Sequence, residues 1–131
     1  MVVDTSAIYA MLVGEPERDR FSEAMDAADR KWVSTMTLVE CASVLLGKDI
    51  EGDPVEILDE FTRLYGLTVV PFDEAQRRFA TEGLARFGKG RHRAKLNIGD
   101  SVAYGLSRSL DQPLLFKGND FILTDVKRVF E

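Results

Sequence analysis

Four acidic residues stand where a carboxylate is either a structural cap or part of a reactive site: Asp4, Glu40, Asp100 and Asp120. Asp4 ends the apolar run Met-Val-Val, and the other two aspartates follow turns that contain glycine. Carboxylates that gather in one place repel each other, so they need protons or cations nearby. Oxygen ligands suit hard cations such as Mg²⁺ or Mn²⁺, which can activate water for phosphoryl transfer.

Each acid also has a purely structural interpretation, which the sequence leaves open. Asp4 and Asp100 could be helix N-caps, because Asp is favoured there. Asp120 could stabilise its turn. Glu40 stands in the apolar run Leu-Val-Glu-Cys-Ala. A carboxylate buried there without a partner would lower the free energy of unfolding by roughly several kcal/mol. It therefore either has a charged partner or faces outward along a narrow polar strip.

The elements that position these acids follow from the hydrophobic pattern. Short apolar runs predict strands at 1–4, 32–34, 67–70 and 114–116. Apolar residues at three- and four-residue spacing predict helices at 6–13, 16–28, 35–46, 54–65, 74–87 and 100–110. We expect 88–98 to be a loop and 121–130 to form a helical turn and a last strand. This alternation indicates the α/β class, with a buried, mostly parallel sheet flanked by helices.

In open parallel sheets, ligands bind beyond the carboxyl ends of the strands. Asp4, Asp100 and Asp120 are each expected at a strand end or a helix start on that edge. Glu40 lies early in a helix that could point back at it. We therefore expect the acids to converge on one pocket, and their joint placement is more informative than any one of them.

Composition excludes several classes of protein. The 131 residues predict a single domain spanning 1–131. One cysteine, Cys41, allows neither an internal disulfide nor a zinc site made of several thiolates. No apolar run approaches the roughly 18–20 residues of a membrane span, and the N-terminus does not resemble a signal peptide, so we expect a cytoplasmic protein with no membrane contact. Gly88-Lys-Gly lacks the spacing of a phosphate-binding P-loop.

The chain is acidic, with a net charge of -5, yet one loop is strongly basic. This basic loop contains Arg86, Lys89, Arg91, His92, Arg93 and Lys95. Such a loop is either a solvated surface segment or a contact for a polyanion. His92 is the only histidine, and its two arginine neighbours favour a phosphate or solvent contact over a role as general base.

The sequence resembles PIN-domain ribonucleases from end to end, and in particular VapC-like toxins of bacterial toxin–antitoxin pairs. V-V-D-T-S-A and T-L-V-E-C-A resemble the family segments that carry the first two acids, here Asp4 and Glu40. F-G-K-G-R-H-R-A-K-L-N-I-G-D-S-V-A-Y-G-L resembles the segment with the third, here Asp100. L-L-F-K-G-N-D-F-I-L-T-D-V resembles the segment with the fourth, Asp120, which is the most variable acid in the family. Arg93 stands where the family often has proline.

The resemblance implies a three-layer α/β/α PIN fold and an endoribonuclease that cleaves tRNA or ribosomal RNA. It implies that the four acids hold one or two Mg²⁺ or Mn²⁺ ions, with Thr5, Ser6 and Asn119 orienting them. It further implies a homodimer, a cognate antitoxin that occupies the active-site groove, and RNA binding by the basic loop.

Two other hypotheses remain. One is a non-catalytic PIN-like module that binds RNA or protein, although a pure binder gains nothing from a carboxylate in an apolar helix. The other is a phosphatase with Asp4 as nucleophile. Asp4-Thr-Ser has no second nearby aspartate to act as the acid, which disfavours the phosphatase.

Overall fold

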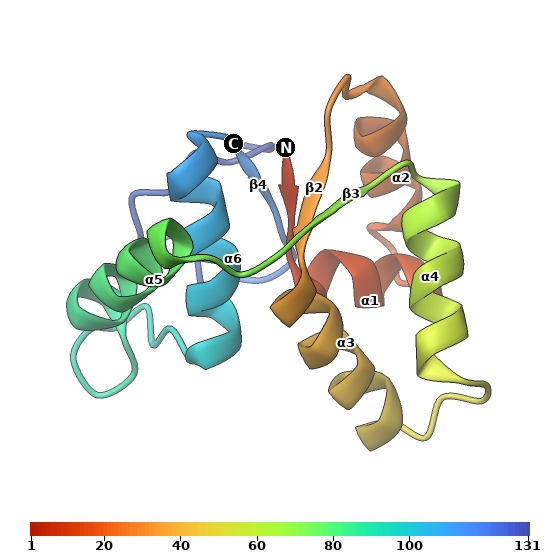
Figure 1. Ribbon diagram of the computed structural model, residues 1–131, viewed down its shortest axis with the longest axis horizontal. Coiled ribbons are helices and arrows are strands. Elements are labelled where there is room, and N and C mark those ends of the chain that lie inside the picture. Colours follow the sequence, from red (N-terminus) through yellow and green to blue (C-terminus); the bar gives the residue numbers. More distant parts are fainter.

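Four short parallel strands form the centre of the molecule (Figure 1). The computed structural model describes residues 1–131. The strands are β1 (Val2–Val3), β2 (Trp32–Ser34), β3 (Thr68–Val70) and β4 (Leu114–Leu115), and they lie in the order β3-β2-β1-β4. All three pairs are parallel, with Val2 beside both Trp32 and Leu114. Every connection therefore crosses over the sheet, and the carboxyl ends meet at one edge.

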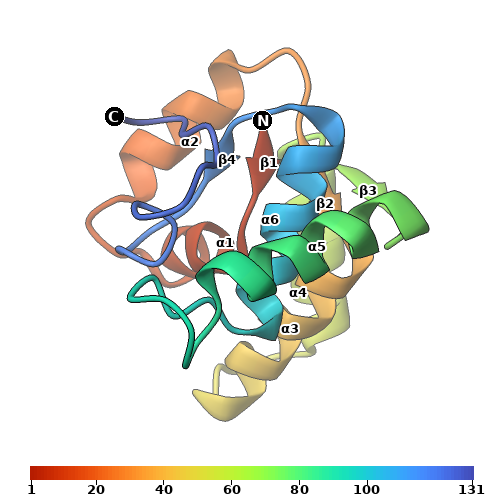
Figure 2. The same ribbon diagram turned by 90° about the vertical axis from the view of Figure 1, so that its left-hand side faces the viewer.

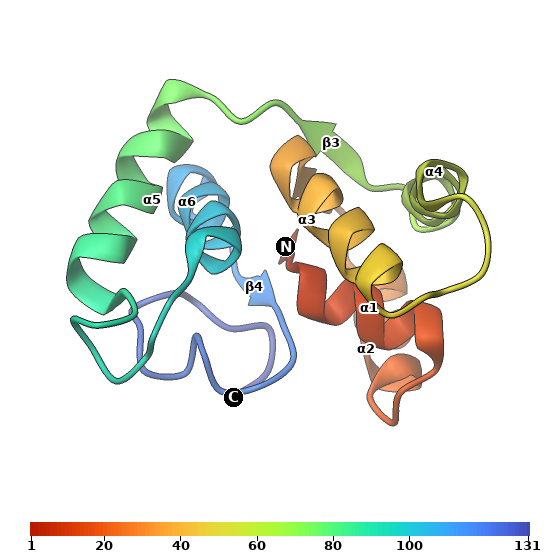
Figure 3. The ribbon, with the colours of Figure 1, turned by 90° about the horizontal axis from the view of Figure 1, so that it is seen from below.

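The helices cover both faces of the sheet. They are α1 (Thr5–Val13), α2 (Arg18–Ala27), α3 (Thr35–Gly47), α4 (Pro54–Leu64), α5 (Glu74–Phe87) and α6 (Ile98–Leu110). Figures 1 and 3 show α5 and α6 on one side and α1 to α4 on the other. Val2 packs into the core with α6, whereas Val3 packs into the core with α1, since successive strand side chains point to opposite faces. This confirms the three-layer prediction.

Local sequence signals explain most helix boundaries. Ser34, Asp53 and Asp73 each accept a hydrogen bond at a helix start, from the backbone N–H groups of Met36 (3.1 Å), Val55 (2.9 Å) and Gln76 (2.9 Å). Gly14 ends α1 with a φ of 75°, which a residue with a Cβ rarely adopts. None of the helices combines the length and the apolar character needed to cross a bilayer.

Three predicted boundaries are wrong. Helix α6 begins at Ile98, not at Asp100, because Asn97 is the N-cap. Helix α2 begins at Arg18 rather than at residue 16. The last strand expected within 121–130 does not form, and only one isolated bridge joins Arg128 to Leu114. Two backbone hydrogen bonds of Leu114, from its N–H to Lys127 (2.9 Å) and to its carbonyl from Val129 (3.2 Å), attach this segment to β4. Side chains add to them, because Asp125 accepts hydrogen bonds from Tyr104 and from two arginines.

Candidate active site

Asp4 lies at the junction of β1 and α1, on the carboxyl edge of the sheet. Its Oδ2 atom accepts hydrogen bonds from the backbone N–H (3.0 Å) and the hydroxyl (2.5 Å) of Ser6, so Asp4 is the N-cap of α1. Its Oδ1 atom is buried and has no hydrogen-bond partner. Burial raises the pKa of Asp4 to about 7, the bonds from Ser6 lower it, and the charges of Asp100 and Glu40 raise it further. Capping thus accounts for only one of its two oxygens.

Ser6 joins the first helix to the far end of the chain. Besides donating to Asp4, its hydroxyl accepts a hydrogen bond from the backbone N–H of Lys117 at 2.9 Å. The Lys117 side chain forms ion pairs with Glu15 and Glu17. The loop that carries Asp120 is therefore attached directly beside Asp4, and the predicted role of Ser6 in orienting Asp4 has a geometric basis.

Asp100 occupies the first turn of α6, in a reciprocal capping box. The Asp100 backbone N–H donates to Asn97 Oδ1 (2.9 Å), and Asp100 Oδ2 accepts from the backbone N–H of Asn97 (3.0 Å). Burial raises the pKa of Asp100 to about 6, the bond from Asn97 lowers it, and the charges of Asp120 and Glu40 raise it. The residue is half-buried, and capping engages only one of its carboxylate oxygens.

Glu40 comes from α3, and its carboxylate lies against the backbone of Gly99. A Cβ atom added at Gly99 would lie 1.1 Å from Glu40 Oε2, so only glycine leaves room for the carboxylate in this position. Helix α3 is exposed on one face, where Val39 and Leu46 are 63% and 62% exposed. Glu40 itself is half-buried and faces the start of α6.

Three of the four acids line a single hollow of about 250 Å³. Its lining residues are Asp4, Thr5, Ser6, Tyr9, Glu40, Val44, Asn97 and Asp100. Figure 3, seen from below, shows α6 facing α1 and α3, the helices that contribute the other acids. The fourth acid, Asp120, is exposed on its loop outside this lining, although its charge acts on Asp100.

The hollow suits a hard cation by its chemistry. No three Asp, Glu, His or Cys side chains form a ready-made ligand set around one point. The fit depends instead on the oxygens that remain free: Asp4 Oδ1 is buried without a donor, and Asp4 and Asp100 both have pKa values raised by burial and by neighbouring carboxylates. A divalent cation would satisfy the unpartnered oxygen and offset this repulsion.

Two predicted orienting residues, Thr5 and Asn119, form no hydrogen bond to the acids, although Thr5 lines the hollow. The Thr5 hydroxyl donates to the backbone carbonyl of Thr37 at 3.3 Å, which joins α1 to α3 rather than to an acid. Asn119 is exposed beside Asp120, and its side chain has no hydrogen bond to the acids. Sequence analysis missed Asn97 and Gly99, although the spacing Asn-Ile-Gly-Asp already matched a capping box.

The basic loop contains four exposed cations without an ion pair: Lys89, Arg91, Arg93 and Lys95. Figure 2 shows it protruding beside the end of α5 and the start of α6. Arg86 differs, since it forms ion pairs with Glu82 (3.1 Å) and Asp125 (3.0 Å). His92 Nδ1 accepts a hydrogen bond from the backbone N–H of Ala94 at 3.0 Å, so this histidine helps to shape the loop.

Comparison with known proteins decides the family. A family model described as PIN domain matches residues 1–127. The chain belongs to the PIN domain family. Within this family it is VapC-like: it is 41% identical to Ribonuclease VapC30 of Mycobacterium tuberculosis over 129 residues, which covers 98% of each chain. It is 40% identical to Ribonuclease VapC of Mycolicibacterium smegmatis, with 98% of this PIN domain and 99% of that protein covered.

A solved structure supports the fold of this PIN domain. It is the crystal structure of Mycobacterium tuberculosis VapC20, titled a Sarcin-Ricin loop cleaving toxin. The TM-score is 0.72 over 95% of each chain, at 16% sequence identity. At that identity the likeness concerns the fold alone, and it agrees with the three layers described above.

Proposed function

We propose that this PIN domain is the toxin of a toxin–antitoxin pair, an endoribonuclease that hydrolyses RNA phosphodiester bonds with Mg²⁺ or Mn²⁺. The full-length relatives named ribonucleases support the activity. The observation that carries the site is the hollow itself, where Asp4, Glu40 and Asp100 meet and one buried carboxylate oxygen of Asp4 has no partner.

The acids divide their roles by position. Asp4 and Asp100 would hold the cation with the oxygens that capping leaves free, Glu40 would complete the set from α3, and Asp120 would join from its loop. When bound, the ion lowers the pKa of a water molecule and offsets charge on the leaving oxygen. Ser6 and Asn97 fix the rotamers of Asp4 and Asp100 through the hydrogen bonds described above.

The substrate of this proposal is a single-stranded segment of RNA, in tRNA or ribosomal RNA, which places the action in the cytoplasm. The exposed cations Lys89, Arg91, Arg93 and Lys95 would bind its phosphates, next to the start of α6 that carries Asp100. Arg86 already pairs with two carboxylates, and His92 would contribute through its loop turn. The proposal therefore assigns most of the phosphate binding to the four unpaired cations.

Two protein partners belong to the same proposal. A cognate antitoxin would occupy the acidic hollow, where a basic side chain would replace the cation as the balancing charge. A second copy would form a homodimer. Exposed apolar side chains on α3 and at the start of α6, namely Met36, Val39, Leu46 and Ile98, offer a surface for this association.

The test is cleavage of purified single-stranded RNA by wild-type protein and by Asp100→Asn, each with Mn²⁺ or with EDTA. We expect cleavage only for wild type with metal, and unchanged circular dichroism for the variant. Asp59→Asn, an exposed residue of α4, is the matched control and should cleave like wild type. Equal cleavage by Asp100→Asn and wild type would refute the assignment.

A further inference from the structure

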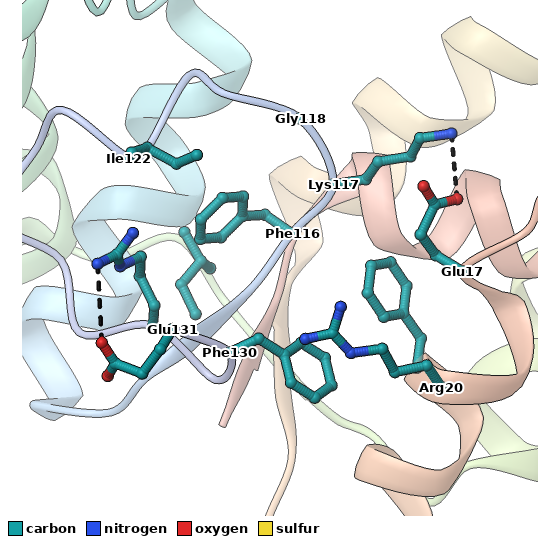
Figure 4. Close-up of a pocket in the computed structure, with 11 residues that line it drawn as sticks. Glu17, Arg20, Phe116, Lys117, Gly118, Ile122, Phe130 and Glu131 are labelled. Atoms are coloured by element: carbon teal, nitrogen blue, oxygen red, sulfur yellow. Dashed lines mark ion pairs between the residues drawn. The ribbon is translucent and has the colours of Figure 1, made fainter.

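A second cavity, of about 190 Å³, lies against the segment that contains Phe116, Gly118 and Ile122 (Figure 4). It is open to solvent and is bounded by α2, β4, the segment 116–122 and the last residues of the chain. Its lining residues are Glu17, Arg20, Phe21, Leu114, Phe116, Lys117, Gly118, Ile122, Arg128, Phe130 and Glu131.

Two guanidinium groups of this cavity are available to an anion. Arg20 forms no ion pair, and its guanidinium carbon lies 3.7 Å from the centre of the Phe130 ring. The only ion pair of Arg128 is with Glu131, at 3.9 Å, and that glutamate is 97% exposed. Lys117 is already paired with glutamates and turns away from the cavity (Figure 4).

Aromatic side chains also line the cavity. Figure 4 shows Arg20 reaching over Phe130, with Phe116 and Ile122 across the cavity. Phe116 is supported from behind by Phe121, with the ring centres 5.1 Å apart. Guanidinium groups beside aromatic faces are the combination by which proteins hold an unpaired base and its phosphate.

The cavity and the acidic hollow have no lining residue in common, but hydrogen bonds through Lys117 and Ser6 link them. Gly118 and Ile122 line the cavity on either side of Asp120 in the sequence. The backbone N–H of Lys117 donates to Ser6, whose hydroxyl bonds to Asp4. Only two hydrogen bonds therefore separate a lining residue of the cavity from the carboxylate at the centre of the acidic hollow.

We propose that this cavity binds one nucleotide of the RNA strand, next to the bond that is cut. The base would lie against Phe116, because the Phe130 ring is already stacked with Phe21 and covered by the Arg20 guanidinium. Its phosphate would bind Arg20 and Arg128. This inference rests on the proposed function, because it takes RNA as the ligand. It makes the cavity a determinant of which nucleotide may flank the cleavage site.

The test separates binding from cleavage. A pool of single-stranded RNA containing 5-iodouridine is mixed with the full chain in EDTA, irradiated, and the crosslinked residues are identified by mass spectrometry. We expect crosslinks at Phe116. Loss of the stacking partner in Phe116→Leu should weaken binding about 5-fold or more.

Arg20→Gln should also weaken RNA binding and reduce the slope of log affinity against log salt by about 0.7. Arg30→Gln is its matched control, because Arg30 is exposed, forms no ion pair and does not line the cavity. The control should keep wild-type affinity. Thermal unfolding of each variant shows that the fold is unchanged.

The outcomes of this experiment distinguish the cavity from the nuclease. Crosslinks in the cavity without cleavage in Mn²⁺ would support the nucleotide site and refute the proposed nuclease activity. Cleavage with crosslinks confined to the basic loop, and equal affinity for Arg20→Gln and Arg30→Gln, would overturn the nucleotide site alone. Arg20-dependent binding of an acidic aromatic peptide, with no RNA crosslink in the cavity, would assign it to a protein partner and also overturn the inference.

Discussion

Replacing Asp4 by asparagine should change the stability of the metal-free protein by an amount that depends on pH. Burial and neighbouring carboxylates raise the pKa of Asp4 from 3.8 to about 7, so the folded state holds a proton that the unfolded chain releases. The free energy of unfolding therefore falls as the pH rises from about 4 to about 7. Above that range the full cost of ionising Asp4 in the folded state is present. At about 1.4 kcal/mol for each pKa unit, this cost is about 4 kcal/mol.

Asparagine removes the charge, but it lowers the free energy of unfolding for a separate reason. Its oxygen can still accept from Ser6, but its amide nitrogen takes the buried position of the unpartnered Oδ1 atom. A buried unsatisfied group costs about 1–3 kcal/mol at any pH. The variant should therefore be less stable than wild type at about pH 4 and more stable by about 1–3 kcal/mol at about pH 8.

Urea unfolding in EDTA at the two pH values measures this difference. Asp26→Asn, an exposed residue of α2, is the control and should show the same small effect at both. Adding Mn²⁺ at the higher pH should stabilise wild type by about 1.4 kcal/mol at ten times the dissociation constant, and should not stabilise Asp4→Asn comparably. A wild-type-to-variant difference that stays constant between the two pH values would refute the reasoning.

Three further predictions concern the neighbours of the acids. Gly99→Ala should displace the Glu40 carboxylate and lower the rate of RNA cleavage at least about 10-fold with little loss of thermal stability. Gly47→Ala, at the end of α3 with open space around it, should leave cleavage unchanged and stabilise the protein by about 0.5–1 kcal/mol. Ser6→Ala should lower metal affinity, measured by calorimetry, about 10-fold, and an unaltered affinity would exclude its orienting role. Arg91→Ala should weaken RNA binding and reduce the slope of log affinity against log salt by about 0.7. Turnover at saturating RNA should be retained, and its loss would contradict the assignment.

Local patterns predicted the elements of this fold well because caps and periodicity are short-range. The spacing Asp-Pro before α4 and the apolar run of β2 each identify an element without knowledge of the rest of the chain. The segment 121–130 shows the limit of such patterns. Its apolar residues suggested a strand, but hydrogen bonds from Tyr104 and Arg108 to Asp125 hold it in turns, and sequence spacing does not reveal such distant partners.

The candidate site shows the same division. The rule for parallel sheets placed Asp4, Asp100 and Asp120 on one edge, with Glu40 pointing back at it. Asp4, Glu40 and Asp100 do line one hollow, whereas Asp120 lies outside its lining. Burial on all sides does not confine Glu40, because α3 exposes an apolar face to solvent. The close contact of Glu40 with Gly99 could not be predicted, since it depends on the packing of α3 against α6.

The hydrogen bond between Ser6 and Lys117 joins residues that are 111 positions apart. β4, which precedes Lys117, is also the strand that completes the pairing of β1. During synthesis Asp4 therefore leaves the ribosome long before the segment that will hold it in place. A nascent chain carries the first acid without the scaffold around it, and Asp4 can be held in place only after the segment around Lys117 has also been synthesised.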